Sequence, residues 1–154
     1  MTVVPFTDRE MQRAWRDNLQ ASNHASRTNA HRLLLFYSIE CGLKAVLMKR
    51  MAVNCTSLCS GITDAQHNIN KLLDYLSAGQ SLKLPTQLQM LPIKIQGVDT
   101  ERKLDSGKIN QAWRYGGSLM KLSASTSKST TIEDSLIEKH LMQISEWIRK
   151  ELNS

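Results

Sequence analysis

The sequence predicts an all-α domain, a single bundle of four to five helices that spans residues 1–154 around a long central helix. Residues 33–51 are apolar on almost every side, which is typical of a helix enclosed at the centre of a domain. The chain has only three prolines and seven glycines, which suits helices better than a many-turned β fold. No alternating pattern longer than a few residues competes with these helical patterns.

The first helix is predicted over residues 8–21. Thr7 and Glu10 have the spacing of a capping box, in which the threonine hydroxyl and the glutamate carboxylate close the first helical turn. The central helix is predicted over residues 23–52. Its first two turns are polar, and we expect them to project beyond the core or to pack on another subunit.

A third helix is predicted after a loop over residues 54–61 that is rich in serine, threonine and cysteine. Asp64 can cap this helix and Gly79 can end it. Its apolar positions recur at helical spacing: Ile69, Leu72, Leu73 and Leu76.

Residues 80–108 carry the weakest pattern in the chain. A short helix is expected over residues 85–91, where Pro85 can open it and Pro92 can end it. Residues 96–105 are expected to form a polar loop.

The C-terminal third of the chain is expected to hold two more helices. A short one covers residues 109–113 and stops at two glycines. Residues 123–130 have low complexity and are expected to form a mobile loop. The last helix begins at Thr130 or Thr131, and its buried stripe is Leu136, Ile137, Leu141, Ile144, Ile148 and Leu152.

The charge of the chain is basic and unevenly distributed. The net charge is +6, and residues 1–52 hold eight Lys or Arg against four Asp or Glu. Residues 83–121 hold seven against three. Two such regions could meet in the fold as a phosphate-binding surface, and the alternative is an ordinary solvated surface.

Membrane insertion and secretion are not expected. No run of about 18 uncharged apolar residues occurs, and the first ten residues lack the pattern of a signal peptide. The three cysteines, an odd number, fit a reducing cytoplasm better than a disulfide scaffold. Cys55 and Cys59 provide too few ligands for a zinc site, and we predict no metal and no cofactor.

Two segments resemble the HEPN superfamily. The first is Ser38-Ile39-Glu40-Cys41-Gly42-Leu43-Lys44-Ala45-Val46-Leu47, and the second is Gln66-His67-Asn68-Ile69-Asn70-Lys71-Leu72-Leu73. Members often carry an E-x-x-L-K-A helix followed by H-[DN]-[LI]-x-x-L. The resemblance implies an all-α bundle of four to five helices, and it is best over residues 23–78. It also implies a component of a bacterial toxin–antitoxin, abortive-infection or antiphage system.

Many members of that superfamily are metal-independent endoribonucleases that act as dimers. Their signature places a histidine after an arginine with four to six residues between, and the nearest match here is Arg27 and His31, with three between. In a continuous helix both would share one face. Arg27 could hold a phosphate while His31 moves the proton of a 2′-hydroxyl. The alternative is a polar helix start without chemistry.

Three further groups of residues are candidates for binding. Glu40 and Lys44 stand four apart, as a structural ion pair or as a site in which Glu40 orients Arg114 or His67. His67 and Asn68 open the third helix, in a structural or a binding role. The most unusual local sequence could bind a base and a phosphate, or could pack as an aromatic helix end: Asn110, Trp113, Arg114 and Tyr115.

The expected function is that of a HEPN-like defence or toxin–antitoxin component that binds RNA or a nucleotide-bearing partner, as a degenerate ribonuclease. One alternative is a non-enzymatic adaptor or antitoxin-like protein that regulates a larger effector encoded nearby. A second is an active ribonuclease that uses Arg27 and His31. We expect a cytoplasmic homodimer.

Overall fold

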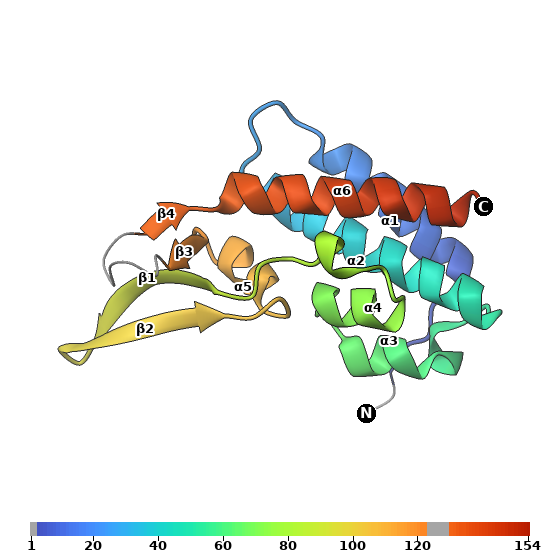
Figure 1. The fold of residues 1–154 in the computed structure, drawn as a ribbon, viewed down its shortest axis with the longest axis horizontal. Coiled ribbons are helices and arrows are strands. Elements are labelled where there is room, and N and C mark those ends of the chain that lie inside the picture. The colour runs from blue at the N-terminus through green and yellow to red at the C-terminus, as the bar shows by residue number, and fades with distance from the viewer. Residues whose placement is uncertain (1–2, 123–129) are drawn as a thin grey trace.

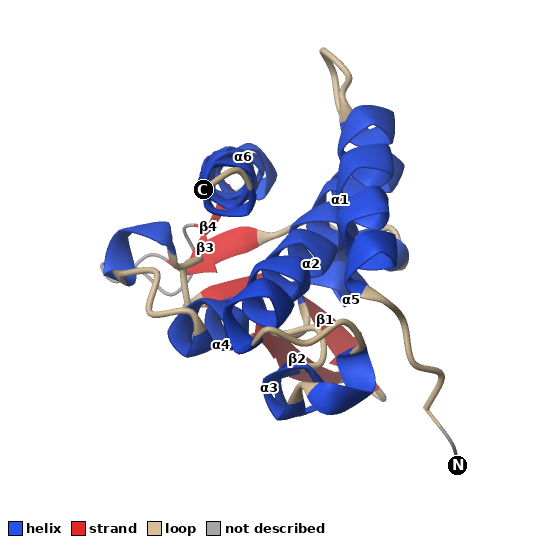
Figure 2. Ribbon diagram, turned by 90° about the vertical axis from the view of Figure 1, so that its right-hand side faces the viewer, coloured by secondary structure: helices blue, strands red, loops and turns tan. Residues whose placement is uncertain are grey.

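The computed structural model describes residues 3–122 and 130–154, with the side chains of residues 121, 122 and 130–132 left aside. The helix α2 (Asn29–Met51) lies at the centre, and α1 (Asp8–Ser22), α5 (Ile109–Arg114) and α6 (Asp134–Leu152) pack against it (Figures 1 and 2). Leu35, Phe36 and Ile39 of α2 have no exposed surface. The predicted enclosed central helix is therefore confirmed.

The helices α1 and α2 begin where local capping places them. The capping box of Thr7 and Glu10 is present, and α1 ends within one residue of its predicted bound. By contrast, α2 begins at Asn29 and not at residue 23, because Thr28 is its N-cap and His31 reaches back to the backbone of Thr28. Residues 23–28 form a loop, so the predicted projecting helical turns are absent from this stretch.

The predicted third helix is two short helices. After the 3₁₀ turn η1 (Thr56–Leu58), α3 (Ser60–Ala65) and α4 (Ile69–Tyr75) are joined by a tight turn, and η2 (Gln80–Leu82) follows. Asp64 therefore lies inside α3, and Asn68 is the residue that caps α4 by accepting a hydrogen bond from Lys71 N at 3.1 Å.

The all-α prediction is wrong, because the chain contains an antiparallel sheet of four strands. The strands are β1 (Leu88–Ile95), β2 (Val98–Leu104), β3 (Met120–Leu122) and β4 (Thr130–Ile132), in the order β2-β1-β3-β4. The fold is mixed α/β. The hairpin of β1 and β2 occupies the segment that had been expected to hold a short helix and a polar loop.

Two local features explain how this segment forms a hairpin. Gln96 and Gly97 both have positive φ, 50° and 79°, which is the geometry of the two-residue turn that matches strand twist. Pro92 lies where the register between β1 and β2 shifts, between Met90 and Ile93. A bulge tolerates proline, because no ladder hydrogen bond is needed there.

The C-terminal elements follow the prediction more closely. The short helix α5 is confirmed, and Gly116 follows it with φ of 81°. The helix α6 begins at Asp134 and not at residue 130 or 131, because residues 130–132 pair with β3. Most of the predicted α6 stripe is fully buried, whereas Leu136 is 39% exposed and Leu152 is half-buried. The predicted mobile loop over residues 123–130 lies outside the described residues, apart from Thr130.

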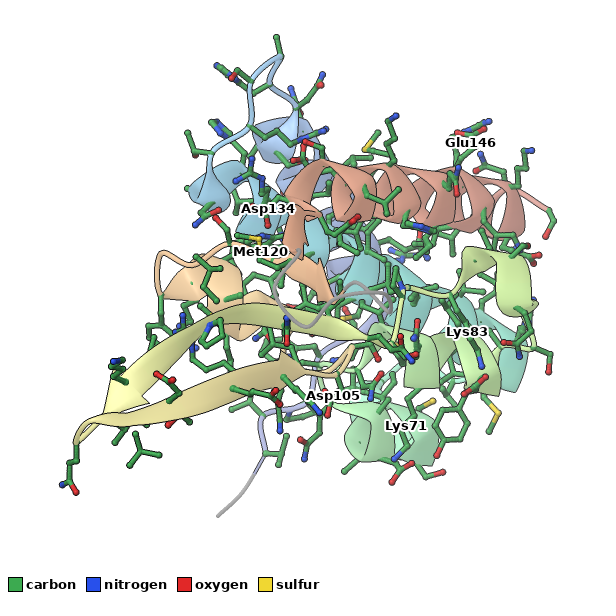
Figure 3. The ribbon with its side chains drawn as sticks, turned by 60° about the vertical axis from the view of Figure 1, so that its left-hand side comes forward. Lys71, Lys83, Asp105, Met120, Asp134 and Glu146 are labelled. Carbon is green, nitrogen blue, oxygen red and sulfur yellow. The ribbon has the colours of Figure 1, made fainter. Side chains whose placement is uncertain are left out.

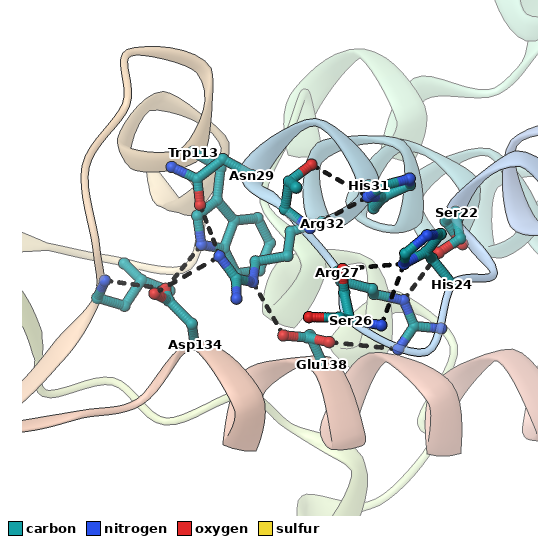
Figure 4. Close-up of polar contacts among 12 residues, drawn as sticks. Ser22, His24, Ser26, Arg27, Asn29, His31, Arg32, Trp113, Asp134 and Glu138 are labelled. Atoms are coloured by element: carbon teal, nitrogen blue, oxygen red, sulfur yellow. Dashed lines mark hydrogen bonds and ion pairs between the residues drawn. The ribbon is translucent and has the colours of Figure 1, made fainter.

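A polar network joins the ends of α2, α5 and α6 (Figure 4). Asp134 Oδ1 accepts hydrogen bonds from Trp113 Nε1 at 2.8 Å and from Leu119 N at 3.0 Å. Arg32 Nε lies 2.9 Å from Glu138 Oε2. These contacts are buried or half-buried, and each buried donor would lack an acceptor without its partner. Throughout the part of the chain that is described, no helix has the length and apolar composition of a membrane span.

We expect Asp134→Ala to lower the free energy of unfolding by about 3 kcal/mol, because two buried donors lose their acceptor. Urea denaturation followed by circular dichroism measures this change. Glu146→Ala is the matched control, since Glu146 points outward from α6 (Figure 3) and pairs with Arg149 in solvent. Equal effects of the two variants would contradict the role given to Asp134.

Candidate functional site

The candidate site is built around Glu40, a carboxylate on the central helix that is only 7% exposed. Lys44 Nζ lies 3.0 Å from its Oε2, and His67 Nδ1 lies 2.7 Å from its Oε1. Each oxygen of the carboxylate therefore has its own cationic or protic partner. A buried carboxylate without such partners would be strongly destabilising.

Both sequence-based interpretations of Glu40 describe real contacts. Lys44 follows Glu40 by one helical turn, and the predicted ion pair is confirmed. Glu40 also contacts His67, one of the two residues that we expected it to orient. The other, Arg114, instead lies over the ring of Tyr115, with Cζ 5.6 Å from the ring centroid.

His67 reaches Glu40 from the turn between α3 and α4. The preceding residue, Gln66, has φ of 51° and ψ of −112°, a conformation that glycine adopts readily and other residues adopt at a cost. Asn68 then starts α4 by capping it. His67 was expected to open the third helix, but it lies in the turn before α4 and bonds to a side chain of α2.

A pocket of about 450 Å³ opens beside this cluster. Lys44 and His67 line it, together with the hydroxyl-bearing residues Thr56, Ser57 and Thr63. The remaining lining residues come from the N-terminal segment, from α3 and from the turn that follows it: Val3, Pro5, Ile62 and Gln66.

The N-terminal segment is held against the pocket by Thr56. Phe6 N donates to Thr56 Oγ1 at 2.9 Å, and Thr56 N donates to Phe6 O at 2.8 Å. Sequence reasoning treated residues 54–61 as a loop and did not include them in a site. Their high content of serine and threonine was the available signal.

The arrangement can bind an anion and can move a proton. Lys44 has three N–H donors and Glu40 uses one of them. Because a carboxylate only accepts, the contact with Glu40 requires a proton on His67 Nδ1, and in the neutral ring Nε2 is then a proton acceptor. A carboxylate that fixes the tautomer of a half-exposed imidazole is the usual support of a general base.

Cys41, the neighbour of Glu40, is not part of this chemistry. Burial and the adjacent Glu40 carboxylate raise the pKa of the Cys41 thiol to about 11, although Lys44 acts in the opposite direction. The thiol is therefore protonated at neutral pH and is a poor nucleophile.

Arg27 and His31 do not share a helix face. Arg27 precedes α2, where its Nη1 lies 3.3 Å from Glu138 Oε1 and its Nε donates to Ser22 O. His31 Nδ1 accepts a hydrogen bond from Thr28 N at 3.1 Å, and its ring stacks on His24 (Figure 4). These contacts serve the start of the helix. The catalytic role of Arg27 and His31 stays a prediction. Neither residue lines the pocket beside Glu40.

The other predicted binding residues are divided between the core and the surface. Asn110 and Trp113 are 5% and 2% exposed, and the Trp113 indole bonds to Asp134. Arg114 and Tyr115 are exposed, with Tyr115 at 74%. Asn110 Oδ1 is buried and lacks a hydrogen-bond partner among the described residues.

Metal ligands do not gather in the described part of the chain. Among residues 3–122 and 130–154, no group of three or more histidine, cysteine, aspartate or glutamate residues is arranged to hold an ion. Cys55 Sγ contacts Ser57 Oγ at 3.0 Å, and Cys59 is buried.

We expect Gln66→Gly to raise the free energy of unfolding by about 1 kcal/mol, because glycine removes the strain of a positive φ. Urea denaturation measures the change. Gln87→Gly is the matched control, since Gln87 is exposed in a loop with an ordinary backbone. If Gln66→Gly lowers the free energy of unfolding as much as Gln87→Gly does, the backbone at Gln66 is not strained.

We also expect alkylation of Cys41 by iodoacetamide at pH 8 to be on the order of 100-fold slower in the folded chain than in urea, because only the thiolate reacts. The rate should rise with pH until about 11, where the thiol ionises. Mass spectrometry of peptides measures labelling at each pH. Equal rates in folded and unfolded protein at pH 8 would contradict this expectation.

Comparison with known proteins gives no relative. No family model matches the chain, and neither the curated proteins nor the solved structures contain a match.

Proposed function

We propose that this chain is a HEPN-like component of a bacterial defence or toxin–antitoxin system that binds RNA. A phosphate of the RNA occupies the pocket lined by Lys44 and His67. The observation that carries the proposal is the convergence of both side chains on the buried carboxylate of Glu40 beside that pocket. The chain acts in the cytoplasm, in line with its three free cysteines.

The composition of the pocket supports a phosphate ligand. Glu40 uses one of the three N–H donors of Lys44, so two remain for the oxygens of a phosphate. Hydroxyl groups of Thr56, Ser57 and Thr63 line the same space and can donate to phosphate oxygens. The volume of about 450 Å³ lies within the usual range for sites that hold small ligands, and the chain carries a net charge of +6.

The contact between Glu40 and His67 favours a second, catalytic form of this function, namely metal-independent cleavage of the bound RNA. His67 Nε2 would take the proton of a 2′-hydroxyl, whose oxygen attacks the adjacent phosphorus as the bond to the 5′-oxygen breaks. A proton from solvent then completes the 5′-hydroxyl. The 2′,3′-cyclic phosphate that results is a specific product to measure.

We expect Lys44→Gln and His67→Gln each to weaken RNA binding by about tenfold, because each removes roughly 1–2 kcal/mol of charge-assisted bonding to phosphate. Fluorescence anisotropy with a labelled single-stranded RNA measures the affinity. Glutamine keeps a hydrogen-bond donor near Glu40, which protects the fold, and thermal denaturation verifies this.

Lys139→Gln is the matched control, since Lys139 is exposed on α6 and does not line the pocket. Its affinity should remain close to that of the unmodified chain. No RNA binding, or equal affinity in all variants, would contradict the proposal and favour the protein adaptor. Cyclic-phosphate products that disappear in His67→Gln would establish the catalytic form.

A further inference from the structure

The hairpin of β1 and β2 extends away from the helices (Figure 1) and has an uncovered edge. In the sheet order β2-β1-β3-β4, β2 is an outer strand. Among the described residues, no strand pairs with its outer side. The backbone N–H and C=O groups on that side are therefore open to a further strand.

One face of the hairpin is apolar at its two ends and is interrupted between them by Thr100 and Arg102. Directly opposite residues share a face, and this face holds the pairs Leu88↔Leu104 and Ile95↔Val98. Its inner end belongs to the core, where Leu88 is 2% exposed. Its outer end is uncovered, with Ile95 at 52% and Val98 at 65% exposure. Exposed apolar residues at the end of a sheet whose outer strand is unpaired indicate an interaction surface.

The other face of β2 carries charges in an ordered sequence. Asp99, Glu101 and Lys103 alternate with the residues of the apolar face, and all three are exposed. The acidic residues come first along the strand and the lysine comes last. A strand with this order is complementary to itself when a second copy runs antiparallel to it.

We propose that β2 pairs in antiparallel orientation with β2 of a second copy of this chain, so that one sheet crosses both molecules. With the two-fold axis at Glu101, Asp99 lies opposite Lys103 of the partner subunit, and Lys103 opposite its Asp99. Val98 meets Leu104 of the partner subunit on the apolar face. The two Glu101 side chains meet at the axis, where Lys103 Nζ lies 3.5 Å from the carboxylate of its own chain and offsets the repulsion.

This interface differs from the one that the sequence suggested. A dimer was expected through the central helix and its polar start. Most apolar residues of α2 are already covered within one chain, as Leu43 and Met48 with no exposed surface show, although Met51 at its end is 55% exposed. The hairpin therefore offers a better surface for a second copy, and it does not involve the phosphate pocket of the proposed function.

A charge reversal tests the pairing. Analytical ultracentrifugation of the full chain over a range of concentrations should show a monomer–dimer equilibrium. Asp99→Lys and Lys103→Glu should each weaken the dimer by at least about tenfold, because like charges then lie opposite each other. The double variant Asp99→Lys/Lys103→Glu should return the dissociation constant to within about threefold of the original, since both attractive pairs are restored.

Two further measurements distinguish this interface from a dimer that forms through a different surface of the molecule. Lys139→Glu on α6 changes a lysine to glutamate outside the sheet and should leave the dimer unchanged. Hydrogen exchange of the backbone amides over residues 98–104 should slow as the concentration rises. A monomer at every concentration would overturn the proposal, as would a dimer that neither single reversal weakens or a double variant that stays monomeric.

Discussion

The rest of the structure depends on the burial of α2 with a carboxylate inside it. Because the helix is apolar on almost all sides, other helices must cover it, and α1, α4, α5 and α6 do so. Gly42 permits the closest approach, since a Cβ there would lie 2.8 Å from side-chain atoms of both Trp15 and Ile148. Glu40 is enclosed by the same packing and requires partners, so the core itself fixes where Lys44 and His67 must lie.

The helices with strong local signals could be predicted from the sequence. The capping box of Thr7 and Glu10 defined the start of α1, and the apolar period of residues 137–148 defined the buried face of α6. The pairing of Glu40 with Lys44 was equally local, because their separation is one helical turn. In these cases the structural cause lies within four residues along the chain, which is the range that a sequence pattern covers.

The hairpin and the His67 contact could not be predicted in the same way. Pro92 suggested the end of a helix, whereas a bulge in β1 accommodates it, and the turn at Gln96 and Gly97 lacks the asparagine that commonly marks such turns. His67 meets Glu40 across 27 positions of sequence, through a strained turn that no periodic pattern announces. The start of α2 was misplaced because the polar residues before Thr28 are compatible with a helix or a loop.

The two segments that carried the family resemblance are those that meet at the pocket. Glu40 comes from the first and His67 from the second, and the two side chains are in contact. The sheet is the part of the chain that an all-helical bundle does not contain. Its hairpin lies outside the segments that resemble the family, and it holds the only long strands in the described chain. The core therefore gathers around one buried helix, which contributes Lys44 to the pocket, whereas the hairpin is a separate structural addition with its own uncovered surface.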